Sequence, residues 1–563
     1  GKDVVQLYYT APYGDATTNT TKIEKAYVVL ADFAKTPTLY PADQADADHP
    51  NSATVTLTLD VRDMASYDYV TDKAYVLDDG DYTVSVRSDA HTAEDSATYT
   101  VEEKVVLNTD TDARGNEVTV TNRFDDVSAG IFGDTEYSDY ISRSDFAGTV
   151  PADYLADEER TLTAELKDAL DLSIRRSYTQ SDEGMPWQVT GAAPSTTPVD
   201  SGLSLEDMLY DEDGNYVGSV DFDDPRWETL LNEISIDEMK TLIGYAAFRT
   251  NAVEGVNGVV NKPMTNDADG PSGFTSFISE SVIYGTASYQ GECVMGATWN
   301  VDLARRMGEL VGEEGLAGNE NGDGMPYTGW YAPAANIHRS PFGGRNWEYY
   351  SEDGLLSGKL AAGVIEGASS KGTICYMKHF AVNDQETDRE YNGILVWANE
   401  QSMREIYLKP FEIAVKEGGA MGMMSSFNRL GMTWAGGSYA LLTEILRDEW
   451  GFRGAVITDY SMNTYTQVDL MIRAGGDLFL TQASKTFAKD DDATQITLLR
   501  NATKNILYVT ANSNVMSLTV DGYMMPLWQE VMIYIDVAIV VGLAVWGVLI
   551  ILSAKKKEKS GKQ

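Results

Sequence analysis

Polar and charged side chains stand at the ends of several apolar, strand-like segments in the second half of the chain. The segment NKPMTNDADG carries Asp267 and Asp269, GTICYMKHF carries Lys378 and His379, and AVITDY carries Asp459. The loop after GWYAPAANI adds His338, Arg339, Arg345 and Glu348. If these ends meet at one rim, a carboxylate kept ionised by nearby cations can act as a nucleophile, and the same groups can clamp the hydroxyls of a sugar.

Aromatic residues are frequent around these segments, and sugar rings have apolar faces that stack on such side chains. They include Trp299, Trp330, Tyr331, Trp347, Tyr349, Tyr350, Trp397, Trp434 and Tyr460. Core filling is the alternative role for many of them. A metal site is not expected, because His338 and His379 lie on different segments and lack a short ligand spacing such as HExxH.

The elements that must position these residues lie between 225 and 512, where apolar runs alternate with helical patterns. Two of the helical patterns are VDLARRMGELVGEEGLA and YALLTEILRDEW. Strands that alternate with helices over this length predict an α/β unit with a parallel sheet, and a TIM-type (β/α) barrel is the favoured form. A dinucleotide-binding fold is disfavoured, because no phosphate-cradling glycine loop follows a strand.

Residues 1–106 show a different, all-β pattern. The short alternating runs VVQLYY, KAYVVLADF, ATVTLTLDV, DYTVSVR and ATYTV are separated by turn-rich stretches, and they predict a small β-sandwich. Residues 107–224 are rich in Thr, Asp, Gly and Ser; they predict a partly ordered connector with one helix near 157–172. The first residues lack the apolar core of an export signal, which a protein placed outside the cell needs. We therefore expect the chain to be a processed or truncated part of a longer protein.

Composition excludes some classes of protein. The chain has 563 residues with 86 acidic and 43 basic side chains, a formal net charge of −43, which argues against binding to a phosphate backbone. The 43% hydrophobic content allows a large core, so the acidity does not indicate global disorder. Cys293 and Cys375 are the only cysteines, too few for a disulfide framework.

The C-terminal region predicts a membrane anchor. Residues 531–553 are apolar except for Asp536 and are followed by a lysine-rich tail, 554–563. The length suits a single helix across a bilayer, and the lysines indicate a cytoplasmic tail. We therefore expect a juxtamembrane linker at 513–530, a transmembrane helix at 531–553, and a catalytic part outside the cell membrane.

Four ordered motifs resemble a known enzyme family. GGRNWEYYSEDGLLSGKLAAGVIEG, KHFAVNDQETDR, MMSSFNRL and LRDEWGFRGAVITDY resemble the barrel of glycoside hydrolase family 3, in its β-glucosidase-like branch. GKDVVQLYYTAPYG, KAYVVLADFAKT and DVRDMASYD resemble the fibronectin type III-like domain that many of these enzymes carry. Here that domain precedes the barrel, as in a permuted subgroup of the family.

The resemblance implies roles for particular residues. Asp459 would be the nucleophile that forms a covalent glycosyl-enzyme. Substrate-binding roles are expected for Asp269, Arg345, Lys378, His379, Arg389, Phe427 and Tyr460. Metal ions and organic cofactors are not implied.

Three departures from the family pattern are visible. Phe427 stands where many members have Tyr, and GFTS follows the DGP motif where many members have Arg. The acid/base of this branch usually comes from a separate α/β-sandwich domain that the chain does not contain. In the permuted order this domain would lie upstream of Gly1, so the acid/base is left unassigned and the missing domain is an expected partner.

These features predict a retaining, exo-acting β-glycosidase that acts on a β-linked oligosaccharide or glycoside. Of the β-glycosidases, a β-glucosidase is favoured, and a β-xylosidase is an alternative. A surface carbohydrate-binding or scaffold protein without turnover is another alternative, and glycoside synthesis by transglycosylation is a third. KHFAVN stands in place of the KHFPGH motif of family N-acetylglucosaminidases, which makes that activity a minor alternative.

Overall fold

The computed structural model describes most of the chain. The described residues are 1–14, 23–127, 142–144, 164, 167–168, 181–275, 285–318, 325–387, 389, 393–461, 465–516 and separate positions between 532 and 550. The chain divides into two compact units, Gly1–Val515 and Met516–Gln563. The helix predicted near 157–172 falls almost wholly outside the described residues.

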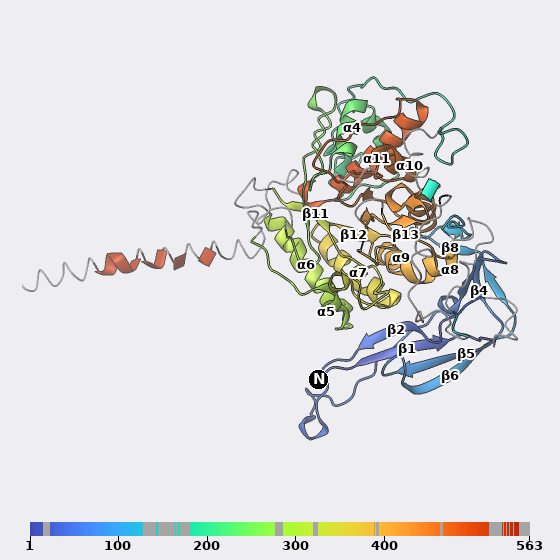
Figure 1. Ribbon diagram of the computed structural model, residues 1–563. Helices are drawn as coiled ribbons and strands as arrows, with labels where there is room; N and C mark the ends of the chain where they lie inside the picture. The colour runs from blue at the N-terminus through green and yellow to red at the C-terminus, as the bar shows by residue number, and fades with distance from the viewer. Residues whose placement is uncertain are drawn as a thin grey trace, which may run out of the picture. The chain divides into compact units, whose positions relative to one another are not determined.

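The N-terminal part is a β-sandwich, as the alternating runs predict (Figure 1). One sheet has the order β2-β1-β5-β6, formed by Val29–Lys35, Val4–Thr10, Gly80–Arg87 and Ala93–Val101. The other has the order β3-β4-β7, formed by Ser66–Asp68, Ala74–Leu77 and Val105–Leu107. A small hairpin, β8 (Thr109–Thr111) with β9 (Glu117–Thr119), follows.

One predicted strand of the sandwich is wrong. The run ATVTLTLDV forms no strand: residues 53–60 have no regular structure, and a 3₁₀ turn, η2 (Val61–Met64), follows. Its alternation is genuine, because Leu59 packs against the core between the sheets. The segment lacks backbone pairing with a neighbouring strand, and Thr58 instead donates its N–H to the side chain of Asp32 at 2.7 Å.

The second part is an α/β barrel-like domain. Its parallel sheet has the order β10-β11-β12-β14-β17, formed by Asn266–Asp269, Tyr327–Tyr331, Ile374–Phe380, Gly422–Ser425 and Ala455–Ile457. Leu478 adds one parallel bridge to Ile457 beyond β17. The predicted run DLFL (477–480) therefore contributes a bridge and not a full strand. A small sheet, β13-β15-β16, is formed by Leu395–Val396, Arg429–Leu430 and Thr433–Trp434.

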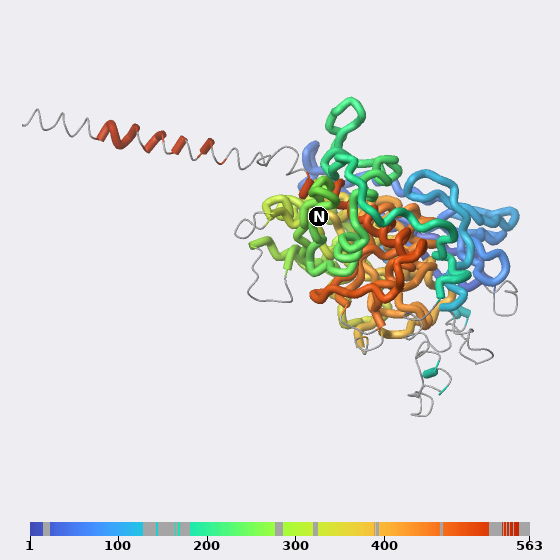
Figure 2. The backbone as a smooth tube through the Cα atoms, turned by 90° about the horizontal axis from the view of Figure 1, so that it is seen from above, coloured from blue at the N-terminus to red at the C-terminus, as the bar shows by residue number. Residues whose placement is uncertain are grey.

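Helices connect and cover these strands. They include α3 (Arg226–Leu231), α4 (Ile236–Gly244), α5 (Glu292–Gly296), α6 (Val301–Ala317), α7 (Gly354–Ser369), α8 (Glu400–Ser402), α9 (Lys409–Lys416), α10 (Val468–Ala474), α11 (Ala493–Ala511) and the π-helical turns η7 (Met403–Tyr407) and η9 (Ala440–Glu449). Figures 1 and 2 show α11 beside α4, so the two ends of the domain are brought together although they are far apart in the sequence.

Helices α6 and α7 illustrate how the sequence sets local structure. Helix α6 has the bounds that its periodicity predicts, and the side chain of Asn300 caps it by accepting the N–H of Leu303. Its contact with α7 depends on glycine, because a Cβ at Gly308 would collide with the carbonyl oxygen of Val364. The two helices therefore approach more closely than larger side chains would allow.

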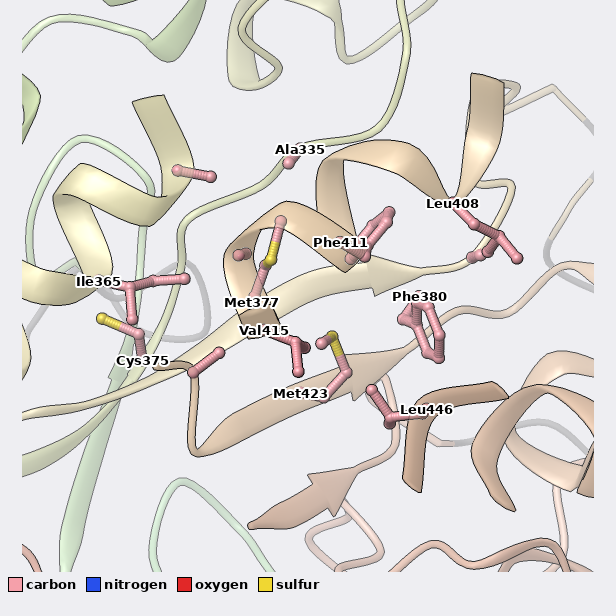
Figure 3. Packing of buried hydrophobic residues seen from close by; sticks show 14 of the residues in the cluster. Ala335, Ile365, Cys375, Met377, Phe380, Leu408, Phe411, Val415, Met423 and Leu446 are labelled. Carbon is pink, nitrogen blue, oxygen red and sulfur yellow. The ribbon is translucent and has the colours of Figure 1, made fainter. Parts of the chain in front are cut away.

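The hydrophobic core of the barrel lies between the sheet and these helices. Met377 and Phe380 of β12 pack with Phe411 of α9 and Met423 of β14 (Figure 3). All are almost completely buried. This packing holds the strands rigidly, so their C-terminal ends have fixed positions.

A buried ion network joins the β-sandwich to the barrel. Arg404 of η7 pairs with Glu400 at 2.8 Å and with Glu449 at 2.5 Å, and it donates to the carbonyl oxygen of Thr121 at 2.7 Å. Glu400 also accepts the N–H of Phe124 at 2.7 Å. Because the network links side chains of the barrel to the backbone that leaves the sandwich, it fixes the connection between them.

The second unit holds the predicted membrane anchor. Among the described residues, none of the helices combines the length and the apolar character needed to cross a membrane. The predicted span 531–553 falls partly outside the described residues.

Candidate functional site

A pocket of about 620 Å³ opens at the C-terminal ends of the barrel strands. The eight residues to which the family resemblance gives a role all line it: Asp269, Arg345, Lys378, His379, Arg389, Phe427, Asp459 and Tyr460. They come from β10, from β12, from the segments after β14 and β17, and from two loops. The predicted convergence of the strand ends is therefore confirmed for these residues, and their individual roles stay predictions.

Asp459 follows β17 and faces the pocket with one oxygen free. Its Oδ1 accepts the N–H of Tyr460 at 2.7 Å, whereas Oδ2 accepts no hydrogen bond from any described residue. His379 Nε2 and Arg389 Nη1 each lie 3.9 Å from Oδ2. Burial raises the pKa of Asp459, and Arg389 and Arg345 offset only part of this rise. The free oxygen has the geometry of a nucleophile.

Lys378 forms the centre of a buried charge cluster. Its Nζ lies 2.7 Å from Asp269 Oδ1 and 3.0 Å from Glu348 Oε1. Burial lowers the pKa of Lys378, but the two carboxylates more than offset this, and the net pKa is raised. Burial raises the pKa of Glu348, but Lys378 and Arg345 lower it below its usual value. Lys378 and Glu348 are therefore held charged at neutral pH.

His379 is held neutral beside the nucleophile. Its backbone N–H donates to Asn336 Oδ1 at 2.7 Å, and its Nδ1 lies 3.4 Å from the hydroxyl of Tyr349. Burial, followed by the charges of Arg345 and the neighbouring cations, lowers its pKa well below the usual value. A neutral imidazole can exchange a hydrogen bond with a sugar hydroxyl without adding a further positive charge.

Two arginines reach the pocket from loops. Arg345 precedes a 3₁₀ turn, η6 (Asn346–Glu348), and pairs with Glu348 at 2.5 Å. Arg389 pairs with Glu386 at 2.8 Å, and its guanidinium lies 4.9 Å from the centre of the Phe427 ring. Guanidinium groups held in this way can bind sugar hydroxyls by charge-assisted hydrogen bonds.

Other polar residues of the predicted rim do not line the pocket. Asp267 lies deeper in the barrel, where it accepts the N–H of Gly329 at 3.1 Å and the hydroxyl of Tyr331 at 3.2 Å. His338 contacts the carbonyl oxygen of Tyr349, and Arg339 pairs with Asp384. These side chains are satisfied structurally, so the expectation that they join the site is wrong.

Sequence reasoning also missed residues that line the pocket. They are Phe248, Gly270, Pro271, Thr275, Met424 and Leu480. Glu348, which the sequence places at the charged rim, and Trp347 and Tyr331, which it offers as aromatics for a sugar to stack on, do line the pocket. Phe248 stacks on Tyr460 with ring centres 6.3 Å apart. Phe248 lies outside the motifs that resemble the family, so the sequence alone gives no sign that it lines the pocket.

Comparison with known proteins supports the resemblance. Residues 265–506 match the glycosyl hydrolase family 3 N terminal domain, and residues 3–90 match the fibronectin type III-like domain. The chain is 31% identical over 467 residues to beta-glucosidase A of Butyrivibrio fibrisolvens, covering 82% of this chain and 49% of the relative. It is 28% identical over 507 residues to a beta-glucosidase of Ruminococcus albus, covering 87% and 46%.

A solved structure is also similar to this chain. The crystal structure of a beta-glucosidase from Paenibacillus barengoltzii matches with a TM-score of 0.62 and 25% identity, over 92% of this chain and 52% of the other. The chain thus spans about half the length of the relatives that it matches. We conclude that it contains the glycosyl hydrolase family 3 N-terminal domain, preceded by a fibronectin type III-like domain, in the order that the motifs predict.

Proposed function

We propose that the chain supplies the nucleophile and the sugar-binding pocket of a retaining β-glucosidase, with Asp459 as the nucleophile. The observation that carries the proposal is the unpartnered Oδ2 of Asp459 in a pocket that Lys378, Arg345 and Arg389 also line. The relatives' names as beta-glucosidases support the choice of glucose.

The first step of the reaction forms a covalent intermediate. Asp459 Oδ2 attacks the anomeric carbon, a C–O bond to the enzyme forms, and the bond to the leaving-group oxygen breaks with its electron pair on that oxygen. In retaining enzymes a second carboxyl group, roughly 5 to 5.5 Å from the nucleophile, protonates the leaving group and then activates water. We assign this second group to no residue of the chain.

The remaining groups position the sugar. Asp269, Lys378 and Glu348 form a linked set of donors and acceptors that suits neighbouring hydroxyl groups on one edge of a pyranose. Phe248 and Tyr460 add apolar surface on which a sugar face can pack. The pocket thus combines charged and aromatic contacts, as sugar-binding sites do.

The test is covalent trapping with 2,4-dinitrophenyl 2-deoxy-2-fluoro-β-D-glucoside. Dinitrophenolate is a leaving group that needs no proton, so the test does not depend on the unassigned acid. Mass spectrometry of peptides should find one fluoroglucosyl group on the peptide that contains Asp459, and the Asp459→Asn variant should acquire none. Calorimetric binding of glucose without any adduct would instead indicate the carbohydrate-binding protein.

We also propose that the catalytic part lies outside the cell membrane. The apolar run at 531–553, followed by a lysine-rich tail, supports this location. Protease treatment of intact cells should release the catalytic part. A chain that stays fully protected would refute this location.

A further inference from the structure

Glu386 lies between the two arginines of the pocket and has no role in the reaction proposed above. Its Oε2 lies 2.8 Å from Arg389 Nε, and its Oε1 lies 3.7 Å from Arg345 Nη1. Among the residues that the structure describes, Glu386 is the only carboxylate that pairs with both arginines.

The Glu386 carboxylate is itself held in place. Asn383 Nδ2 donates to its Oε1 at 3.0 Å, and Asn383 also accepts from Arg389 Nη1 at 3.1 Å. The backbone at Gly344 packs so closely that a Cβ there would lie 3.3 Å from Glu386 Cβ. Glu386, Asn383 and the Phe427 ring thus hold the Arg389 guanidinium from several sides.

This arrangement affects the nucleophile. Each arginine has a close glutamate partner: Arg345 pairs with Glu348 at 2.5 Å, and Arg389 pairs with Glu386 at 2.8 Å. Arg389 Nη1, in contrast, is 3.9 Å from Asp459 Oδ2. A closer ion pair would occupy Oδ2 and reduce its reactivity, because an attacking oxygen needs a free lone pair.

We propose that Glu386 is a positioning residue that holds Arg345 and Arg389 in the sugar-binding arrangement and keeps them from pairing closely with Asp459. The role rests on the proposed function, since it concerns the same nucleophile and pocket. Without the carboxylate, Arg389 loses its closest ion-pair partner and can turn toward Asp459, so both sugar binding and nucleophilic attack should suffer.

The experiment measures the rate of trapping by the fluoroglucoside as a function of pH, for the full chain and its variants. Glu386→Gln should lower the second-order rate by about 10²-fold, a size typical of a misplaced catalytic constellation. Glu366→Gln is the matched control: Glu366 is exposed on α7, 3.6 Å from Arg305, and its rate should not change.

The pH profile separates positioning from general structural damage. The acid limb reports the ionisation of Asp459, which faces Arg389, Arg345, Lys378 and His379. Burial raises the pKa of Glu386, and the charge of Asp459 raises it further. Because repulsion between like charges is mutual, the Glu386 charge must also raise the pKa of Asp459. Glu386→Gln, which loses the charge, should therefore move the acid limb to lower pH. Glu386→Asp keeps the charge, so its trapping rate should fall while its acid limb stays at the wild-type pH.

The outcomes are distinguishable. A wild-type chain that is never labelled overturns the proposed function and with it this role. If the wild type is labelled and folded Glu386→Gln shows the same trapping rate and the same acid limb, only the positioning role is overturned. If Glu386→Gln turns over dinitrophenyl glucoside with azide rescue and yields glucosyl azide, Glu386 is the acid/base and the positioning role is wrong. Circular dichroism checks folding, and Glu386→Asp carries the rate test if Glu386→Gln does not fold.

Discussion

Replacement of Lys378 by methionine should destabilise the barrel strongly, and the structure indicates by how much. The side chains of Lys378 and Glu348 are each 3% exposed, and Lys378 also pairs with Asp269. Lys378→Met removes a cation from the buried carboxylate of Glu348 and from Asp269, whose side chain is 21% exposed. Breaking a buried ion pair costs about 3 to 5 kcal/mol when the remaining charge is left uncompensated. Because Arg345 still pairs with Glu348, we expect a loss near the lower end of this range.

The same substitution at the surface provides the control. Lys371 pairs with Glu313 at 2.7 Å, with side chains 33% and 40% exposed. Exposed pairs of this kind contribute roughly 0 to 1 kcal/mol. The free energy of unfolding, measured by urea denaturation and tryptophan fluorescence, should thus fall far more for Lys378→Met than for Lys371→Met.

The pH dependence has a definite sign. In the wild type the pKa of Glu348 lies below its usual 4.5, so its stabilising contribution is present above pH 4.5 and is lost as pH falls through the lowered pKa. In Lys378→Met one of the two offsetting cations is gone, and the pKa of Glu348 rises although Arg345 remains. The stability difference between the two proteins should therefore be full at pH 7 and smaller below pH 4.5.

A second substitution tests the assignment of the energy to the ion pair. Lys378→Met combined with Glu348→Gln removes the buried charge that has lost one of its two cations and should recover part of the lost stability, giving a coupling energy of roughly 0.5 to 3 kcal/mol. If Lys378→Met costs no more than Lys371→Met, or the double variant recovers nothing, the reasoning about the buried cluster is refuted.

Three further predictions concern the rest of the molecule. Arg404→Met should lower the free energy of unfolding by about 3 to 5 kcal/mol in urea denaturation, because the side chains of Arg404 and both its partners are at most 4% exposed; a loss under 1 kcal/mol would contradict this. Burial lowers the pKa of Lys262 to about 7, so the unfolded chain binds the extra proton between pH 7 and 10.5, and stability should rise with pH across that window by up to about 1.4 kcal/mol per unit. Unfolding curves of Lys262→Met should lack this rise. The trapping rate of the wild type should fall through an acid limb above pH 3.8, since burial raises the pKa of Asp459; a limb at or below 3.8 would show that Asp459 is better solvated than its position indicates.

Much of the site could be predicted from the ends of strands. Asp269, Lys378 and Asp459 were predicted because they follow apolar runs, and the C-terminal ends of parallel strands in an α/β barrel meet at one rim. The bounds of α6 were also predictable, because its 3.6-residue period begins after the Asn300 cap. Both signals come from residues that are neighbours along the chain, so they can be read without knowledge of the tertiary structure.

Depth within the barrel was not predictable. Asp267 and Asp269 are two residues apart and so point to the same side of β10, yet only Asp269 lines the pocket. Asp267 lies one layer lower, where the hydroxyl of Tyr331 on the neighbouring strand donates a hydrogen bond to its carboxylate at 3.2 Å. Which layer faces the solvent depends on the neighbouring strand, which a single sequence does not reveal.

The sequence by itself determined the order of the two domains, the strand ends that carry the chemistry, and the candidate nucleophile Asp459. The tertiary structure decided which other residues support them, because Phe248 lines the pocket beside Tyr460 and Glu386 pairs with Arg345, each across a long stretch of the chain. It also decided that Leu59 packs without a strand partner. Periodicity and motif spacing report on neighbours along the chain, whereas these contacts depend on how rigidly packed elements approach one another in space.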